Sequence, residues 1–392
     1  MKAVLILCTA EVLTMLGVFA FPALLPAFVA EWELSSTEAG WIAGIHFAGY
    51  ALAVPVLSAL TDRIDARRIY LLGAGLAALS CLGFALAPGG FWTALTLRLL
   101  GGAGLAGTYM PGLRALVDRT GGPRQPHWIS WYTASFSLGT SVSFLAVGLL
   151  AEMWDWRVAY GIAAASAGAA VALVAAALAP VAPAAPSGAG PLLDFRPVFS
   201  NRAAMGYVLA YGAHTGELFA LRSWQVAFLA FVLAGGGGTA PYGFSPTAIA
   251  TWGALAAMAA SIWGAGQAMR HDRARVCAAW GLASAAMALG LGFLAGLPYE
   301  WAAAAILLYS VLVQADSAAL TTGAVLAAEP GRRGATIAVH SLVGFGGGFA
   351  APLAFGIILD AAGGGAPSWG LAFAAIGLMA GLGPLALLRC RR

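Results

Sequence analysis

The chain has 392 residues, of which 61% are hydrophobic and only 9% are Asp, Glu, Lys or Arg. Soluble domains carry about 25% charged residues, so this composition excludes a water-soluble globular protein. The formal net charge is +4, but the basic residues lie in short clusters between apolar runs, which argues against a nucleic-acid partner. The four cysteines lie far apart, without CxxC or another ligand spacing, so we expect neither a metal site nor a cofactor.

Apolar runs of about 20 or more residues, the length that a helix needs to cross about 30 Å of hydrocarbon, recur along the chain. They predict an all-α integral membrane protein with twelve transmembrane helices, divided into six-helix bundles at residues 1–178 and 201–392. The Pro-, Ala-, Gly- and Ser-rich segment 179–200 is predicted to be a cytoplasmic linker. The predicted spans are Val4–Ala30, Thr37–Leu60, Ile69–Leu86, Phe91–Leu116, Ile129–Ala151, Val158–Leu178, Ala203–Leu233, Pro246–Met269, Val276–Leu297, Trp301–Ala328, Thr336–Leu359 and Trp369–Leu388.

The distribution of basic residues predicts a multi-pass protein of a bacterial-type inner membrane with both termini in the cytoplasm. In this orientation 17 of the 20 Lys and Arg residues fall in cytoplasmic segments, and only Arg157 lies in an outside loop. The opposite orientation would place nearly every Arg on the wrong side. The cytoplasmic residues are Lys2, Arg63, Arg67, Arg68, Arg114, Arg119, Arg124, Arg196, Arg202, Arg270, Arg273, Arg275, Arg332, Arg333, Arg389, Arg391 and Arg392.

The two halves of the sequence echo each other, as expected of a transporter built from repeats. The segment Gly148–Glu152 followed by Trp156–Tyr160 parallels Gly356–Asp360 followed by Trp369–Phe373. The loop between spans two and three is echoed by the loop between spans eight and nine. A chance match in Ala- and Gly-rich sequence is the alternative.

The loop between spans two and three carries a recognisable pattern, Ser58-Ala-Leu-Thr-Asp62-Arg63-Ile-Asp65-Ala-Arg67-Arg68. It is similar to the signature of the major facilitator superfamily, which is a Gly, then Asp-Arg, then a basic pair. Ser58 stands where the family usually has Gly, and Ala66 replaces a second Gly. The resemblance implies a secondary transporter whose fold has twelve helices in two pseudo-symmetric halves.

The same resemblance implies a gating function for this loop. Asp62 is expected to face the start of the helix near Gly334, because a helix N-terminus favours a carboxylate, and Arg67 is expected to reach Asp118. The alternative for the Arg residues is that they only obey the positive-inside rule. The gating candidates are Asp62, Arg63, Arg67 and Asp118.

Span four contains Arg98-Leu-Leu-Gly-Gly-Ala-Gly104-Leu-Ala-Gly107, which resembles a second family motif, an Arg followed by spaced glycines. An Arg within hydrocarbon is costly unless it faces the interior of the bundle or water, which favours a function; the alternative is that it snorkels to the outer boundary. The glycines are expected to let helix backbones approach closely. The Gly-Pro signature found in span five of many proton-driven drug exporters is absent, although such an exporter remains an alternative.

Ionisable residues inside the predicted spans are the most informative part of the sequence. His214 and Glu217 lie three residues apart on one face of span seven, and Arg222 follows them. A carboxylate left ionised against lipid is costly, so Glu217 is expected to line a cavity, to pair with a cation such as Arg222, or to take up a proton. The candidates for proton coupling or for the solute cavity are Glu217, Asp316, His214, His340, Arg98 and Arg222, with Glu11 and His46 as weaker candidates.

Other classes of membrane protein find little support in the sequence. No GxSxG, HExxH or zinc-binding spacing indicates an intramembrane enzyme, and no selectivity element indicates a channel. The sequence has no phosphate-binding loop to indicate a nucleotide-driven pump, and the methionines form no MxxxM pair for copper. The prediction is therefore gradient-driven, proton-coupled movement of a small solute by a monomer in the lipid bilayer. Buried Arg residues suit an organic anion, whereas the carboxylates suit a cation or a proton, and the direction of transport stays open.

Overall fold

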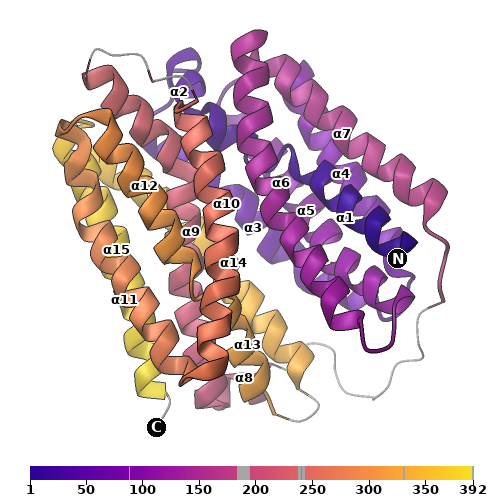
Figure 1. Ribbon diagram of the computed structural model, residues 1–392. Coiled ribbons are helices and arrows are strands. Elements are labelled where there is room, and N and C mark those ends of the chain that lie inside the picture. The colour runs from indigo at the N-terminus through magenta and orange to yellow at the C-terminus, as the bar shows by residue number, and fades with distance from the viewer. Residues whose placement is uncertain (88, 183–194, 237–239, 241–242, 330–331, 391–392) are drawn as a thin grey trace. The chain divides into compact units, whose positions relative to one another are not determined.

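The computed structural model describes residues 1–392 except 88, 183–194, 237–239, 241–242, 330–331 and 391–392. Within this described part every regular element is a helix (Figure 1). Among the described residues, eleven helical segments are long and apolar enough to cross a membrane. The remaining predicted span, the fourth, forms α5 (Phe91–Arg119), whose glycines, threonines and arginines make it less apolar than the others. The all-α membrane fold predicted from the sequence is confirmed.

The chain packs as two compact units, and the boundary between them runs through two helices. One unit consists of Met1–Leu24 and Ile45–Gly190, and the other of Leu25–Gly44 and Pro191–Arg392. The helices cut by this boundary are α2 (Ala20–Glu31) and α3 (Ser36–Leu60). The division into halves at 1–178 and 201–392 stays a prediction, and much of the predicted linker 179–200 lies outside the described residues.

The remaining helices each belong to one unit. In the first unit they are α1 (Lys2–Met15), α4 (Ala66–Leu86), α5, α6 (Gln125–Met153) and α7 (Trp156–Ala177). In the second they are α8 (Arg196–Ser200), α9 (Arg202–Gly235), α10 (Pro246–Arg270), α11 (Arg273–Leu291), η1 (Gly292–Gly296), α12 (Tyr299–Gln314), α13 (Ser317–Ala327), α14 (Arg333–Ala361) and α15 (Ala366–Cys390).

Span one is not the continuous helix that the sequence predicts, because it is interrupted between α1 and α2. Pro22 has no N–H, so the carbonyl oxygen of Val18, four residues earlier, lacks its helical donor. Arg98 on α5 donates to that oxygen at 2.7 Å, and Ser143 on α6 donates to the carbonyl oxygen of Leu16 at 2.7 Å. Irregular backbone within a membrane protein needs such internal partners.

Span ten is also divided, and the break lies at its acidic residue. α12 ends at Gln314 and α13 begins at Ser317, so Asp316 lies in the turn between them. The carbonyl oxygen of Ala315 occupies the space where Gly264 of α10 has no side chain. The break therefore packs directly on a neighbouring helix and holds Asp316 inside the second unit, where it is 5% exposed.

Glycines on α5 bring it close to two neighbouring helices. A Cβ added to Gly107 would lie 2.7 Å from the Cα of Gly73 on α4, and a Cβ on Gly102 would overlap the carbonyl oxygen of His46 on α3. The expectation that the glycines of span four allow close helix packing is confirmed.

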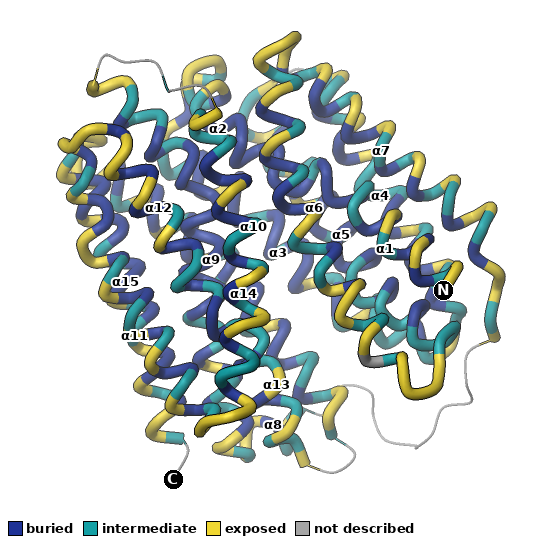
Figure 2. The backbone as a smooth tube through the Cα atoms, in the orientation of Figure 1, coloured by how far each residue is buried: buried dark blue, intermediate teal, exposed yellow. Residues whose placement is uncertain are grey.

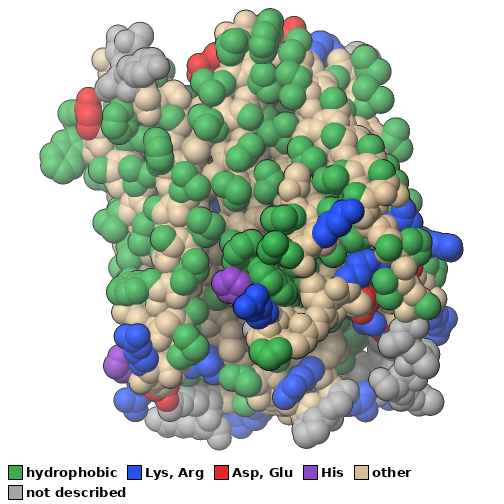
Figure 3. Space-filling model, turned by 45° about the vertical axis from the view of Figure 1, so that its right-hand side comes forward, with side chains coloured by type: hydrophobic (Ala, Val, Ile, Leu, Met, Phe, Trp, Pro, Cys, Tyr) green, Lys and Arg blue, Asp and Glu red, His purple; other side chains and the backbone are tan. Residues whose placement is uncertain are grey.

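The surface of the protein is largely apolar. Figure 2 shows exposed and buried stretches alternating along the long helices, so that each helix has an outward face. Large side chains such as Leu52, Leu86 and Leu378 lie on these outward faces. In Figure 3 hydrophobic side chains are spread widely over the visible surface. Extended apolar surface of this kind suits contact with lipid.

Candidate functional site

The second unit encloses a pocket that contains three of the residues singled out in the sequence. His214 and Glu217 come from α9, and Asp316 from the break between α12 and α13; all three line the pocket, together with Cys277 and Gly281 of α11. Each of the three is at most 5% exposed. The acidic residues of spans seven and ten thus lie in one pocket, and their function in proton coupling stays a prediction.

Glu217 has two hydrogen-bond donors and both come from other helices. The Tyr309 hydroxyl of α12 donates to Oε1 at 2.9 Å, and the Ser284 hydroxyl of α11 donates to Oε2 at 3.1 Å. These donors are neutral, so they orient the carboxyl group without compensating a negative charge. Sequence reasoning did not find Tyr309 or Ser284, because a hydroxyl within an apolar span gives no distinctive pattern.

His214 connects Asp316 to an aromatic stack. Its Nδ1 lies 2.9 Å from Oδ1 of Asp316. Tyr211 stacks on both histidines, with ring centroids 5.7 Å from His214 and 3.8 Å from His340, and Nε2 of His340 lies 3.2 Å from the Thr321 hydroxyl. His340 therefore lies next to the acidic pocket but is separated from it by the ring of Tyr211.

Arg222 lies on the same helix as Glu217 and contacts a different group. Its Nη2 is 3.4 Å from Oε1 of Gln314, at the end of α12, and its guanidinium lies over the ring of Phe219 at 5.9 Å. Arg222 is 7% exposed. Glu217 and Asp316 therefore share the pocket with His214, whereas the buried Arg222 contacts Gln314.

Arg98 and His46 lie together in a pocket of the first unit. They line it with Cys81 and Tyr160, and Nδ1 of His46 lies 3.2 Å from the carbonyl oxygen of Arg98. Because Arg98 also donates to Val18 at the interruption of span one, it stabilises the irregular backbone. Arg98 is 3% exposed, so the snorkelling alternative is wrong.

Glu11, a weaker candidate, lies in the core of the first unit. Its Oε2 accepts a hydrogen bond of 2.9 Å from the Tyr132 hydroxyl of α6. The surrounding cluster is apolar and includes Leu7, Ala74 and Leu116. Its donor Tyr132 is a neutral hydroxyl, and burying a charge without a cation is costly.

The signature loop makes different contacts from those expected. Arg67 donates to the carbonyl oxygens of Val174 and Ala175 at the end of α7, so its expected contact with Asp118 is wrong. Asp118 is bound by Arg114, which also contacts Asp62, at 2.8 and 2.9 Å respectively. Arg114 is one turn before Asp118 on α5, and this spacing places the Arg114 guanidinium next to the Asp118 carboxylate.

Two further residues of the loop complete the description of this region. Arg63 is exposed. Asp65 caps α4 and accepts hydrogen bonds from the backbone N–H groups of Arg67 and Val181 and from Arg119. Burial by itself would raise the pKa of Asp65, but these donors hold that pKa below its ordinary value. The pairing of Asp62 with the start of α14 stays a prediction.

A sequence model of the Major Facilitator Superfamily matches residues 7–251, which is more than half of the chain. The chain belongs to the major facilitator superfamily. The resemblance seen in the loop between spans two and three and in span four is confirmed.

Relatives and solved structures agree with this assignment. The MFS-type transporter YwoD of Bacillus subtilis (strain 168) is 30% identical over 126 residues, which are 32% of this chain and 27% of YwoD. The MFS-type transporter Ent638_1421 of Enterobacter sp. (strain 638) is 25% identical over 149 residues, which are 38% of this chain and 39% of the relative. The chain therefore matches well under half of the length of these curated relatives.

Two solved transporters share the fold over nearly the whole chain. A bacterial homologue of the human lysosomal transporter Spinster, in an inward-facing and occupied conformation, superposes with a TM-score of 0.73 at 16% identity, covering 99% of this chain and 94% of that one. A variant of the nucleoside transporter NupG gives 0.78 at 12% identity and covers both chains completely. The likeness to these two transporters shows the fold, and it agrees with a multi-pass membrane protein of this family.

Proposed function

We propose that this transporter moves a small organic anion by alternating access and couples the movement to protons bound at Glu217 and Asp316. The pocket that these two residues share with His214 is the observation that supports the proposal. Two carboxyl groups and an imidazole in one enclosed site, with few neutral donors, can exchange a proton among themselves and with the solute pathway. Both termini are proposed to be cytoplasmic.

The free energy of burying a charge supports a proton carrier at Glu217. An unpaired carboxylate in a low-dielectric interior is costly, and its two donors, Tyr309 and Ser284, are neutral. The neutral acid is therefore favoured in the closed pocket, whereas contact with water favours the carboxylate. A site whose preferred charge changes with its exposure to water can carry a proton through an alternating-access cycle.

The two buried arginines support an anionic solute. Arg98 lies in the first unit and Arg222 in the second, and both are less than 10% exposed. A guanidinium is a strong ligand for a carboxylate or phosphate group. We therefore expect carboxylates to be better ligands than amines or uncharged sugars. Nucleosides belong in the comparison, because a fold relative, NupG, is a nucleoside transporter.

A ligand screen followed by transport assays tests the proposal. The purified protein is heated with carboxylates, amines, sugars, nucleosides and drugs at two pH values, because a ligand that binds the folded state raises its melting temperature. The best ligand is then assayed in proteoliposomes with and without a pH gradient. Glu217→Gln is expected to abolish uphill transport driven by the gradient while allowing exchange of labelled solute, since the pocket keeps its shape without its titrating group.

Glu300→Gln is the matched control, because Glu300 is exposed at the start of α12. It should transport like the unmodified protein. Asp316→Asn is tested in the same way, because two carboxyl groups in one pocket can share the proton. Full uphill transport by both Glu217→Gln and Asp316→Asn would remove proton coupling from this pocket. Stabilisation by amines but not by carboxylates would overturn the anionic solute, and the sign of the pH dependence distinguishes uptake from export.

A further inference from the structure

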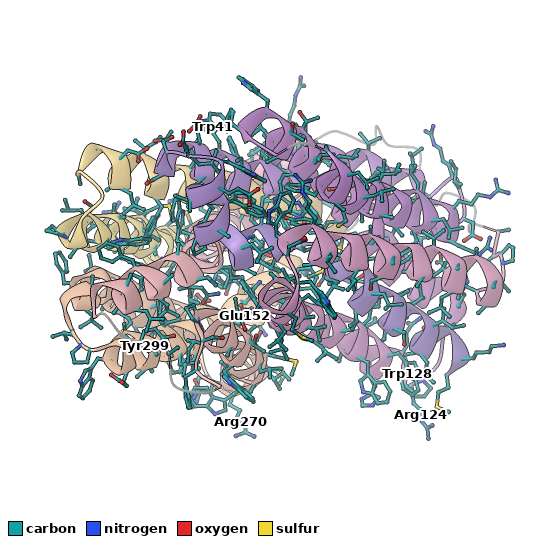
Figure 4. The ribbon with its side chains drawn as sticks, turned by 90° about the horizontal axis from the view of Figure 1, so that it is seen from above. Trp41, Arg124, Trp128, Glu152, Arg270 and Tyr299 are labelled. Atoms are coloured by element: carbon teal, nitrogen blue, oxygen red, sulfur yellow. The ribbon has the colours of Figure 1, made fainter. Side chains whose placement is uncertain are left out.

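The start of α6 carries a cation and three aromatic side chains on one face. They are Arg124, His127, Trp128 and Trp131, whose spacing of three and four residues places them on the same side of the helix. Arg124, His127 and Trp131 are exposed, and Trp128 is partly buried. Figure 4 shows the labelled Arg124 and Trp128 close together at the edge of the view. The apolar part of this span begins at His127, so the face lies where the helix leaves the hydrocarbon.

The three rings form one cluster. The centroid of the His127 ring lies 5.3 Å from that of Trp128 and 5.3 Å from that of Trp131, and the two indoles are also 5.3 Å apart. The planes of the indoles are 85° apart, an edge-to-face arrangement in which aromatic rings attract each other. Trp128 also packs on the apolar core of the first unit, next to residues such as Val4. The rings therefore hold each other, and the core holds the cluster.

The polar groups of this face are all donors. Among the residues that the structure describes, no side-chain hydrogen bond or ion pair engages Arg124 or the indole N–H groups of Trp128 and Trp131. The indole of Trp280 in the second unit, by contrast, donates to Gln267 at 3.1 Å. The first turn of α6 contains no acidic residue. A guanidinium beside free N–H donors, without a carboxylate, suits an oxyanion such as a phosphate group.

Below the rings the same face becomes apolar and stays exposed. Leu138 and Leu145, about two and four turns after Trp131, both lie on the surface. Leu138 is about 10 Å further along the helix axis, which is within the depth of one leaflet of about 15 Å. A ligand that covers the whole face therefore has an anionic end and a long apolar end.

We propose that this face is a binding site for an anionic phospholipid. The site, called the α6 lipid site, consists of Arg124, His127, Trp128, Trp131 and Leu138. The phosphodiester group binds the Arg124 guanidinium and the indole N–H groups, and an acyl chain lies along Leu138. His127 packs against both indoles and keeps them in position. The inference concerns the lipid around the protein and does not rest on the proposed function.

Two related ligands fit the α6 lipid site less well. A free phosphate ion would use the donors but would leave the exposed rings and Leu138 without a contact. A zwitterionic lipid would bring a cation towards Arg124, where the first turn of α6 offers no carboxylate to receive it. The match of charge and of length therefore favours a lipid whose headgroup is a net anion.

Native mass spectrometry of the purified protein tests the α6 lipid site. The protein is stripped of lipid in detergent and titrated with phosphatidylglycerol or with phosphatidylcholine that has the same acyl chains. The first phosphatidylglycerol is expected to bind about tenfold more tightly than the first phosphatidylcholine, a difference of about 1.4 kcal/mol. Glycerol phosphate is titrated in parallel as the soluble form of the headgroup.

Three variants assign the binding to this face. Arg124→Gln is expected to weaken the binding of the first phosphatidylglycerol about tenfold, to the level of phosphatidylcholine. Trp131→Leu keeps an apolar side chain but removes one indole N–H, and it should weaken this binding about threefold. Arg68→Gln is the matched control, because Arg68 is also exposed near the start of a helix, α4. It should leave the affinity unchanged.

The outcomes separate the α6 lipid site from its alternatives. Equal affinities of the parent for the two lipids, or equal losses in Arg124→Gln and Arg68→Gln, would overturn the site. Glycerol phosphate that binds as tightly as the lipid, and that is lost in Arg124→Gln, would assign the face to a soluble phosphate instead. If Arg124→Gln does not purify as a monodisperse protein, Trp131→Leu decides: an unchanged affinity for phosphatidylglycerol overturns the site, and a loss supports it.

Discussion

His214 and Asp316 form a buried pair whose two members come from different spans. Their contact of 2.9 Å joins α9 to the break of span ten. Removing one member leaves a polar group buried without its partner, so His214→Gln and Asp316→Asn should each destabilise the protein by about 1–3 kcal/mol. The double variant should lose less than the sum, with a coupling of about 0.5–3 kcal/mol. Thermal unfolding in detergent measures the stability of the parent, the two single variants and the double variant. Strictly additive losses of stability would contradict an interaction between His214 and Asp316.

Asp65 gives a prediction for the dependence of stability on pH. Its pKa is lowered in the folded state by Val181, Arg67 and Arg119 against the opposing effect of burial. A carboxyl group with a lowered pKa contributes stability above its unfolded value of about 4, and this contribution is lost as the pH falls through the folded value. Asp65→Asn should keep the helix cap but lower the free energy of unfolding by about 1–2 kcal/mol at neutral pH.

The measurement for Asp65 is the difference in melting temperature between the parent and Asp65→Asn. It should be largest at neutral pH and should shrink as the pH falls below about 4. Asp272→Asn is a suitable control, because Asp272 caps α11 through the backbone N–H of Arg275 on the exposed surface. A difference that is constant with pH would mean that the charge of Asp65 contributes nothing.

The sequence predicts which spans carry buried ionisable groups but not what those groups contact. The spacing of His214 and Glu217 placed them on one helix face, and their cost in lipid placed them in a cavity. Tyr309 and Ser284 reach Glu217 from α12 and α11, and such contacts depend on how distant helices pack. The same limit explains the wrong partner predicted for Asp118, since local geometry favoured Arg114.

At the scale of helices, the glycines of α5 determine how closely its neighbours approach. A Cβ at Gly102 would overlap the carbonyl oxygen of His46, which is backbone and cannot rotate away. Gly102→Ala should therefore push α3 from α5 and destabilise the protein by about 1–3 kcal/mol. Gly75→Ala on α4 is the control, because no atom lies within 4 Å of its added Cβ. Equal melting temperatures for the two variants would show that the helices separate without cost.

The helix boundaries predicted from charges, Gly and Pro mostly lie within a few residues of those observed. The two interruptions were missed for different reasons. Pro22 is a visible signal, but its consequence depends on Arg98 and Ser143, which satisfy the freed carbonyl groups from other helices. The turn at Asp316 has no proline or glycine beside it, and its packing against Gly264 is a tertiary contact that hydropathy does not record.

At the scale of the whole molecule, the basic residues predict the orientation in the membrane. Cysteines at Gly121, between α5 and α6, and at Gly365, between α14 and α15, test it, because both positions are exposed and neither has a positive φ. With cytoplasmic termini, Gly365→Cys should react with an impermeant maleimide on intact cells. Gly121→Cys should react only after the cells are permeabilised. The reverse pattern would contradict the orientation.

Leu25–Gly44 packs with the second unit, and this packing imposes an order on biosynthesis. These residues are made early, whereas their partner α14 begins at Arg333, about 300 residues later. At roughly 5–20 residues per second, the ribosome needs roughly 15–60 s to supply it. During that interval Gly40 and Gly44 of α3 lack their backbone contact with α14. The contact between α3 and α14 is therefore among the last parts of the nascent protein to assemble.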